Sequence, residues 1–217
     1  MKTIYFVRHG EAEVNVAQTF GAENTGLTER GRQQAHTLAE RCSKLSIDCV
    51  IVSTMMRAQE TASFISERTH IPLVSSELFE ERKRPTSLIG KQRDDPQATR
   101  LHIQWIDSFF IENKRFEDGE NFLDMKARAA KALSFLEMRS EVNILVVMHG
   151  FMLRTILARI IFGEALLPQE LYMVMRAFNI SNVGITVATL DPSQESERPY
   201  PKGKWRILTW NDLAHLG

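Results

Sequence analysis

Arg8 and His9 stand at the end of the first apolar segment of this 217-residue chain. The segment 3–7 is rich in β-branched and aromatic residues, which favour a buried strand. Because Gly10 follows directly, the backbone can turn tightly at the strand's end and approach a ligand closely. A guanidinium can hold two phosphate oxygens as a fork, and a neutral imidazole nitrogen can attack phosphorus. The pair therefore indicates phosphoryl chemistry, provided that other parts of the chain supply further groups that bind the phosphate.

Two later apolar segments end on side chains of the same kind. The segment 47–52 stops before Ser53, and Arg57 follows near the start of a helical pattern, whereas 143–148 stops before His149. Ligands of parallel α/β sheets bind beyond the carboxyl ends of the strands, so we expect these groups at one edge. Taken singly, His149 would be a satisfied core histidine and Arg57 a solvated helix residue. Their joint placement favours a shared anion site.

Strands and helices alternate along the chain in the order that a mostly parallel sheet requires. The pattern predicts strands at 3–7, 47–52, 72–74 and 143–148, and helices at 35–45, 58–65, 101–109, 122–136 and 151–162. Thr28 is placed to cap the first helix and Gly163 to end the last. We therefore predict an α/β three-layer sandwich, a mostly parallel central sheet with helices on both faces.

Two stretches depart from this alternation. Residues 82–96 are charged and carry proline and glycine, so we expect an excursion that forms a small helical cap over about 82–121. The tail segments 183–190 and 205–210 predict an antiparallel pair joined by a polar, proline-bearing loop. We expect residues 1–217 to form a single domain that includes the cap.

The composition is that of an ordinary globular protein, with 43% apolar and 25% charged residues. Its 27 basic and 27 acidic side chains cancel, so no global field favours nucleic acid or an anionic membrane. The chain reaches Arg8 too soon for a secretory segment, and no apolar run is long enough to span a bilayer. We expect a cytoplasmic protein in which Cys42 and Cys49 are reduced. No Cys/His cluster has the spacing of metal ligands.

Taken in order, the motifs closely resemble the histidine phosphatase superfamily, also called the phosphoglycerate mutase-like family. They are Arg8-His9-Gly10-Glu11 with Asn15, Leu27-Thr28-Glu29-Arg30-Gly31 with Gln34-Ala35, Ser53, Arg57-Ala58-Gln59-Glu60-Thr61-Ala62, Leu78-Phe79-Glu80, Gly119-Glu120-Asn121 with Asp124 and Arg128, and His149-Gly150 with Arg154. Each motif alone is weak, but their order over nearly the whole chain is specific.

The resemblance implies that His9 is a nucleophile that becomes phosphorylated. The groups that would contact the phosphoryl group or the substrate are Arg8, Arg57, His149, Asn15 and Gly150. Two guanidiniums and an imidazolium around the equatorial oxygens can replace a metal, so no metal or cofactor is expected. His9 must be neutral to attack, whereas His149 would serve best as a charged donor.

Glu80 matches the family's proton donor, which would protonate the leaving oxygen and later help water to attack. Glu81 is its neighbour, and on an extended segment only one of the two can face the pocket. The spacing from Leu78 favours Glu80 and leaves Glu81 as the alternative.

The implied activity is that of a histidine acid-type phosphatase, which hydrolyses small phosphate monoesters without a metal. One alternative is phosphoglycerate mutase-type transfer, which needs an insertion after the acid that residues 82–121 do not recognisably supply. The other is a catalytically silent phosphate- or partner-binding module, which the presence of all the central groups argues against. The natural substrate and the oligomeric state stay open.

Further basic side chains have no assigned role. The run that follows Glu80 predicts a solvated loop, or in part contacts with substrate; it contains Arg82, Lys83, Arg84, Lys91 and Arg93. The remaining histidines are not accompanied by other candidate site residues, and we expect them to be structural or on the surface; they are His36, His70, His102 and His215.

Overall fold

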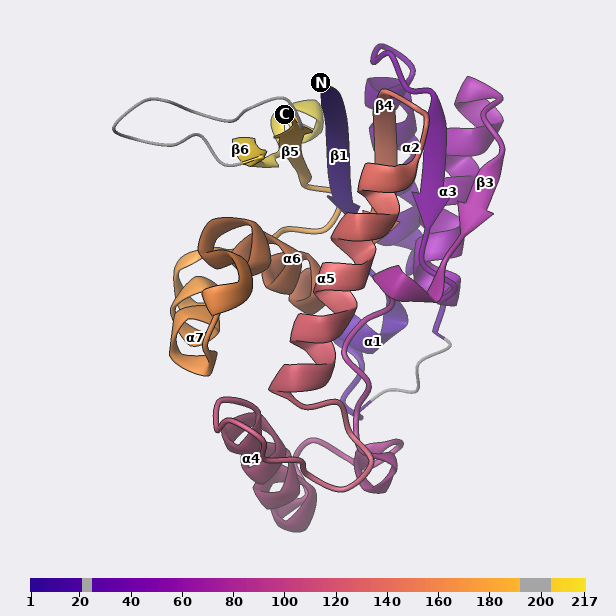
Figure 1. Cartoon of the computed structure of the whole chain (residues 1–217). Coiled ribbons are helices and arrows are strands. Elements are labelled where there is room, and N and C mark those ends of the chain that lie inside the picture. Colours follow the sequence, from indigo (N-terminus) through magenta and orange to yellow (C-terminus); the bar gives the residue numbers. More distant parts are fainter. Residues whose placement is uncertain (21–24, 192–203) are drawn as a thin grey trace.

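The computed structural model describes residues 1–20, 25–191 and 204–217 and places a six-stranded sheet at the centre of an α/β fold (Figure 1). The strands are β1 (Lys2–Arg8), β2 (Cys49–Val52), β3 (Leu73–Ser75), β4 (Asn143–Met148), β5 (Ile185–Leu190) and β6 (Trp205–Asp212). Their order is β3-β2-β4-β1-β5-β6, with the first four parallel and β5 antiparallel to both neighbours. The mostly parallel sheet and the antiparallel tail pair are confirmed. The loop predicted between the tail strands lies outside the described residues.

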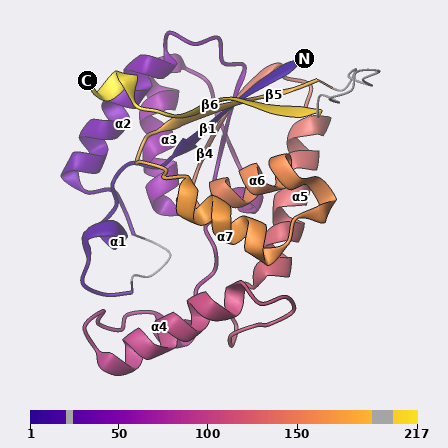
Figure 2. The same ribbon diagram turned by 90° about the vertical axis from the view of Figure 1, so that its left-hand side faces the viewer.

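Helices cover both faces of the sheet, which gives the predicted three layers (Figure 2). The described α-helices are α1 (Glu13–Val16), α2 (Glu29–Cys42), α3 (Met56–Thr69), α4 (Pro96–Phe109), α5 (Phe122–Met138), α6 (Gly150–Phe162) and α7 (Pro168–Ala177). Val7, Leu145 and Val147 pack against α2 and α3, whereas Phe6 and Val146 pack on the side of α5 and α6. Neighbouring strand residues thus point to opposite faces, so one strand serves both core layers.

Helix ends follow the signals in the sequence at two predicted positions. The Thr28 hydroxyl accepts a hydrogen bond from the N–H of Gly31 at 3.0 Å and caps α2. Gly163 has φ +60° at the end of α6, a conformation that favours glycine. The helix α7 was not among the predicted elements. Its buried Leu171 and Val174 lie beside the exposed and equally apolar Met173, which obscures the helical period.

Gly31 has a second role, because the turn that follows β1 passes directly over it. A Cβ atom on Gly31 would overlap the carbonyl oxygen of Glu11, and one on Gly10 would lie 2.6 Å from the carbonyl oxygen of Gly31. Neither position has room for a side chain. This close approach fixes the backbone that follows His9.

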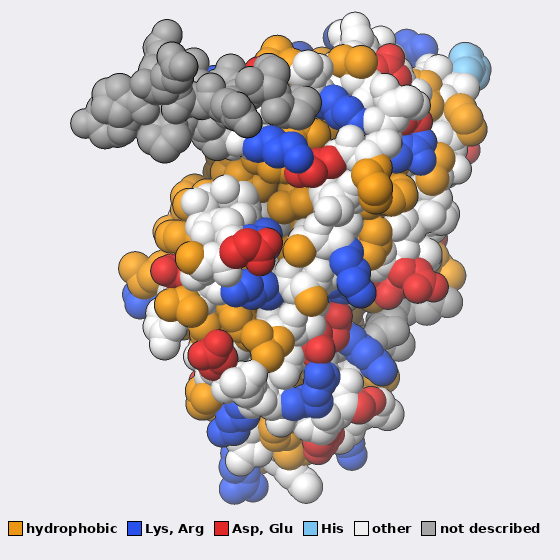
Figure 3. Space-filling model, in the orientation of Figure 1, with side chains coloured by type: hydrophobic (Ala, Val, Ile, Leu, Met, Phe, Trp, Pro, Cys, Tyr) orange, Lys and Arg blue, Asp and Glu red, His pale blue; other side chains and the backbone are white. Residues whose placement is uncertain are grey.

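Residues 82–121, here called the cap, lie beyond the carboxyl ends of the parallel strands (Figure 1). The cap contains α4 and a small cluster of buried side chains, Leu88, Ala98 and Trp105, which is completed by Phe20. Basic and acidic side chains are interspersed on the face of the molecule shown in Figure 3. Among the described residues, no helix combines the length and apolar character needed to cross a membrane.

Candidate active site

The parallel pairing of β1 with β4 brings two histidines together at one edge of the sheet. Arg8 lies opposite Met148 in the register, and the N–H of His9 donates to the carbonyl oxygen of Met148 at 2.9 Å. The rings of His9 and His149 follow these strands and lie with their centroids 5.0 Å apart. On the other side of β4, the N–H of Ser53 donates to the carbonyl oxygen of Val147 at 3.0 Å. Three strand ends therefore converge, as the sequence predicts.

His9 is buried, and each of its ring nitrogens has a defined contact. Nδ1 lies 2.6 Å from the carbonyl oxygen of Gly10, which can only accept, so Nδ1 carries the proton. Nε2 keeps its lone pair and accepts from Nε of Arg57 at 3.2 Å. Burial, followed by the charges of Arg57 and Arg8, holds the pKa of His9 well below its usual value. His9 is therefore neutral, with the lone pair of Nε2 directed toward a guanidinium.

The two predicted arginines approach His9 from different elements. Arg57 lies in the first turn of α3, where its Nη2 contacts the sulfur of Met55 at 3.1 Å. Nη1 of Arg8 donates to the carbonyl oxygen of Ile180 at 2.6 Å, whereas its Nε is buried without a hydrogen-bond partner among the described residues. Gly150 lies directly beside that group, since a Cβ atom there would be in van der Waals contact with Nε of Arg8, at 3.4 Å. Nε of Arg8 is therefore a donor that an anion could use.

The ring of His149 lies beside the ring of His9, and the side chain of Ser53 contacts the ring of His149. The Ser53 hydroxyl lies 2.8 Å from Nε2 of His149 and accepts from the N–H of Met55 at 3.3 Å. With the hydroxyl donating to Nε2, the proton of His149 stands on Nδ1, which is buried with no partner among the described residues.

The charge of His149 differs from the sequence expectation. Burial, then the charges of His9 and Arg57, hold its pKa well below the usual value. The imidazole is neutral at neutral pH, because a charged ring here would be desolvated and would face several cations. A neutral His149 can still donate one hydrogen bond through Nδ1.

A cavity of about 260 Å³ opens beside these groups. Its lining contains Arg8, His9, Asn15 and Arg57 together with Val14, Met55, Glu81, Arg82, Arg84, Ile89 and Arg93. Asn15 lies within the short helix α1, and its Oδ1 accepts from the N–H of Ala12 at 3.0 Å. This bond fixes the amide so that Nδ2 is the group left for other contacts. Arg84 and Arg93 of the basic run line the cavity instead of lying in a fully solvated loop.

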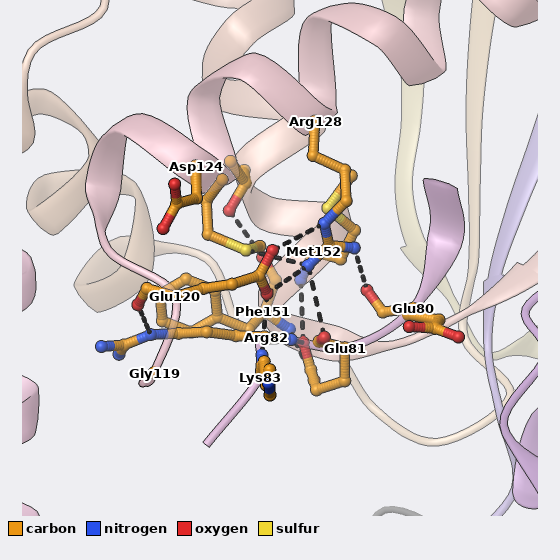
Figure 4. A network of polar contacts seen from close by, with 12 residues as sticks. Glu80, Glu81, Arg82, Lys83, Gly119, Glu120, Asp124, Arg128, Phe151 and Met152 are labelled. Atoms are coloured by element: carbon orange, nitrogen blue, oxygen red, sulfur yellow. Dashed lines mark hydrogen bonds and ion pairs between the residues drawn. The ribbon is translucent and has the colours of Figure 1, made fainter. Parts of the chain in front are cut away.

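The adjacent glutamates have different surroundings (Figure 4). The carboxylate of Glu80 accepts from the hydroxyl of Thr54, next to Ser53 at the end of β2, and is not part of the cavity lining. Glu81 lines the cavity, and its carboxylate accepts from the N–H groups of Phe151 and Met152, each at 3.1 Å. Glu81 thus caps α6 and faces the cavity, whereas Glu80, which the spacing from Leu78 favoured for that place, points away from that network.

A loop before β5 supplies contacts that the sequence reasoning missed. Nδ2 of Asn182 donates to the carbonyl oxygen of His9 at 2.8 Å, and the N–H of Val183 donates to that of Arg8 at 2.9 Å. The carbonyl of Ile180 holds Arg8, as described above. Backbone partners carry no residue-type signal. The φ of Val183, +55°, is unusual for a β-branched residue, but it is visible only in the structure.

Comparisons with known proteins identify the family of the chain and proteins that are similar to it in sequence and in fold. The family model described as histidine phosphatase superfamily (branch 1) matches residues 4–212. A protein of Erwinia tasmaniensis named "Probable phosphoglycerate mutase GpmB" is 28% identical over 221 residues, covering 100% of this chain and 95% of that protein.

Solved structures are similar over nearly the whole length. YhfR of Bacillus stearothermophilus is 25% identical and covers 100% of both chains, with a TM-score of 0.81. A mycobacterial glucosyl-3-phosphoglycerate phosphatase in complex with VO3 is 21% identical, covers 97% of this chain and 99% of that one, and has a TM-score of 0.72. The second likeness concerns the fold alone.

Proposed function

The chain belongs to the histidine phosphatase superfamily (branch 1), and from this premise we propose that it hydrolyses phosphate monoesters through a phosphohistidine formed on His9. The observation that carries the proposal is the state of His9. Its Nδ1 proton is engaged by the carbonyl of Gly10, and its Nε2 lone pair lies 3.2 Å from the Arg57 guanidinium. A neutral, oriented imidazole beside a cation suits attack on a phosphoryl group.

In the first half of the reaction, Nε2 of His9 attacks phosphorus and the ester P–O bond breaks. Arg8, Arg57 and Nδ1–H of His149 offset the charge on the three equatorial oxygens. The leaving oxygen takes its proton from Glu80. In the second half, water attacks the phosphohistidine, the N–P bond breaks, and Glu80 recovers a proton from that water. Inorganic phosphate leaves, and His9 returns to its neutral form.

Glu80 is outside the cavity lining, and to act its carboxylate must turn from the Thr54 hydroxyl toward the leaving oxygen; we assign the acid to it because its neighbour Glu81 is committed to another task. Among the described residues, the Glu81 carboxylate accepts three hydrogen bonds, all from backbone N–H donors, of Phe151, Met152 and Arg82, at 3.0 to 3.1 Å. A protonated carboxyl group would direct an O–H against one of these donors, so Glu81 suits the role of an acceptor. Among the described residues, the hydrogen-bond partner of the Glu80 carboxylate is the Thr54 hydroxyl, and a hydroxyl can either donate or accept.

A second candidate is phosphoglycerate mutase-type transfer through the same phosphohistidine. It is favoured by the name of the Erwinia tasmaniensis relative, a probable phosphoglycerate mutase that covers the whole chain at 28% identity. The two activities differ in the acceptor of the phosphoryl group, which is water in the phosphatase and phosphoglycerate in the mutase.

Turnover of an aryl phosphate in the presence of a chelator tests the proposal. Wild type and His36→Ala, which alters an exposed histidine of α2, should hydrolyse the ester, and His9→Ala should not. Equal activity of His9→Ala and wild type would overturn the proposal. Conversion of 3-phosphoglycerate to its 2-isomer only when bisphosphoglycerate is added, with no net release of phosphate, would favour the mutase.

A further inference from the structure

Glu80 lies at the start of a segment without regular secondary structure. The short helical turn Glu77–Phe79 ends just before it, and the chain then follows an irregular course over residues 80–85. A group that transfers a proton must be held close to its productive geometry, and loops hold such groups less precisely than helices or strands do. The backbone at Glu80 therefore needs support from other parts of the chain.

Arg128 on α5 supplies this support through two backbone contacts (Figure 4). Its Nη1 donates to the carbonyl oxygen of Glu80 at 2.6 Å, and its Nη2 donates to that of Glu81 at 3.3 Å. The neighbouring residues Met125 and Ala129 are buried, so this part of α5 is fastened in the core. The planar guanidinium can bind two successive carbonyl groups at once, which a lysine ammonium cannot match.

Glu120 holds the guanidinium of Arg128 in this orientation. Its Oε1 accepts from Nε of Arg128 at 3.0 Å and its Oε2 accepts from Nη2 at 2.7 Å, which makes a two-point ion pair. Only 15% of the Arg128 side chain and 19% of the Glu120 side chain are exposed. Two parallel hydrogen bonds between opposite charges, largely screened from water, are strong and directional.

Glu120 also binds the irregular segment directly. Its Oε2 accepts from the N–H of Lys83 at 2.8 Å, and its own N–H donates to the carbonyl oxygen of Lys83 at 3.1 Å. The carbonyl oxygen of Glu120 accepts from Nε of Arg82 at 3.2 Å. Together with the contacts of Arg128, these bonds reach every residue from 80 to 83, so the ion pair replaces the missing secondary structure.

The contacts fix the backbone and leave the Glu80 side chain free to turn. Its carboxylate accepts from the Thr54 hydroxyl outside the cavity lining, so it must rotate to reach a leaving oxygen. A fixed backbone limits that rotation to the staggered positions of the side-chain bonds, and few of these direct the carboxyl group to one place. The orientation of the backbone therefore decides whether the acid reaches its target.

We propose that Arg128 and Glu120 are positioning residues for the general acid, because their ion pair fixes the backbone from which the Glu80 side chain turns toward the leaving group. The inference rests on the proposed function, in which Glu80 donates that proton. Neither residue is part of the cavity lining. Loss of the pair should therefore slow hydrolysis most where the leaving group needs a proton.

Arg128→Met, which keeps an apolar stem and removes the guanidinium, tests the proposal with an alkyl phosphate and 4-nitrophenyl phosphate. Its kcat should fall about 10- to 100-fold on the alkyl ester, a part of what a general acid contributes, and stay within about threefold of wild type on the nitrophenyl ester. Arg128→Lys keeps the charge but not the fork, and it should regain part of the loss. Equal losses on the two esters would show a merely structural pair and overturn the proposal.

A second variant covers the case in which Arg128→Met is too unstable to assay, since Glu120 would be left buried without its partner. Combining Glu120→Gln with Arg128→Met removes both charges and should show the same dependence on the leaving group.

Arg115→Met is the matched control. Arg115 forms a neighbouring ion pair with Asp124 at 2.7 Å, and its hydrogen bonds among the described residues go to Gly119 and Asp124, not to residues 80–83. Because this pair is more exposed, its loss should leave kcat on both esters within about twofold of wild type. A loss on the alkyl ester as large as that of Arg128→Met would overturn the proposal.

A double-variant cycle with Glu80→Gln shows whether the ion pair acts through the acid. In the Glu80→Gln background, Arg128→Met should lower kcat on the alkyl ester by no more than about twofold, because the proton transfer that the pair supports is already lost. An undiminished effect would overturn the positioning role, while hydrolysis itself would stand.

A wild type that hydrolyses neither ester would instead refute the proposed function. Hydrogen exchange of a peptide that contains residues 78–84, measured by mass spectrometry, then tests the ion pair separately. Faster exchange of this peptide in Arg128→Met, but not in Arg115→Met, would support the fixing of the segment by the pair. Unchanged exchange in Arg128→Met would overturn it.

Discussion

Exchanging each of two adjacent glutamates for glutamine should separate catalysis from stability. Glu81 accepts three backbone hydrogen bonds and caps α6, whereas the Glu80 carboxylate contacts the hydroxyl of Thr54. Glu80→Gln should therefore remove the general acid while the fold is kept. Glu81→Gln should weaken the start of α6 and change the proton transfer little.

The contacts give the size of each effect. Loss of a helix cap costs about 0.5–2 kcal/mol, and loss of a negative charge at a helix N-terminus costs a further ~0.3–1 kcal/mol. We expect Glu81→Gln to lower the free energy of unfolding by about 2 kcal/mol, which for a chain of this length is about 4–8 °C in Tm. Glu80→Gln keeps an amide oxygen that can accept from Thr54, so its cost should stay within about 0.5 kcal/mol. Its kcat should fall about 10²- to 10⁴-fold for an ester with a poor leaving group.

Urea unfolding and hydrolysis of two esters, an alkyl phosphate and a 4-nitrophenyl phosphate, measure both effects. Glu80→Gln should lose much more activity on the alkyl ester, because a nitrophenolate leaves without a proton. Glu81→Gln should lose activity by a similar factor on both. The reasoning is refuted if Glu81→Gln shows the loss that depends on the leaving group, or if Glu80→Gln loses the two activities equally.

Three further predictions concern the histidines and the arginine that enters the cap. Ser53→Ala should cost about 1–3 kcal/mol in urea unfolding, because Nε2 of the buried His149 would lose its partner, whereas Ser53→Thr should cost less. The pKa values of His9 and His149 are depressed by folding, so below their unfolded value of about 6.5 the unfolded state binds more protons. The free energy of unfolding should thus fall as the pH decreases from about 7 toward 5, and His9→Asn should show a shallower fall; a pH-independent wild type would contradict this. Burial lowers the pKa of Arg82 to about 9 against the opposing charges of Glu120 and Glu81, so its charge is costly to bury; stacking on Trp105 and two carbonyl contacts offset that cost. Arg82→Met should therefore change the free energy of unfolding by no more than about 1 kcal/mol, whereas Arg82→Ala should cost about 3 kcal/mol through the cavity it leaves; equal losses would show that the charge itself stabilises the fold.

The sequence was sufficient to predict the central strands and a mostly parallel sheet with an antiparallel tail pair, but not the order of the strands. Segments such as 143–148, which is β4, are apolar without interruption, and this is typical of a buried parallel strand. The common edge at which His9 and His149 were expected is confirmed, whereas the direct pairing of β1 with β4 that places them side by side was not predicted. The helix α7 escaped prediction because its apolar residues are not confined to one face.

Three features of the site depended on tertiary contacts that residue types do not encode. Which of Glu80 and Glu81 faces the cavity is decided by the N-terminus of α6, a distant segment. The neutral state of His149 follows from complete burial beside other cations, which the motif alone does not reveal. The carbonyl of Ile180 positions Arg8 through the backbone, so any residue type could have stood there.

The most direct test of the central claim is to trap the phosphoenzyme. Wild type and His9→Ala would be mixed with an aryl phosphate, quenched in alkali within the first turnover, and analysed by intact mass and peptide mapping. The account predicts the added mass of one phosphoryl group in wild type, located on His9 by peptide mapping and lost on treatment with acid, and none in His9→Ala. A phosphoryl group on another residue, or turnover that continues in His9→Ala, would contradict the account.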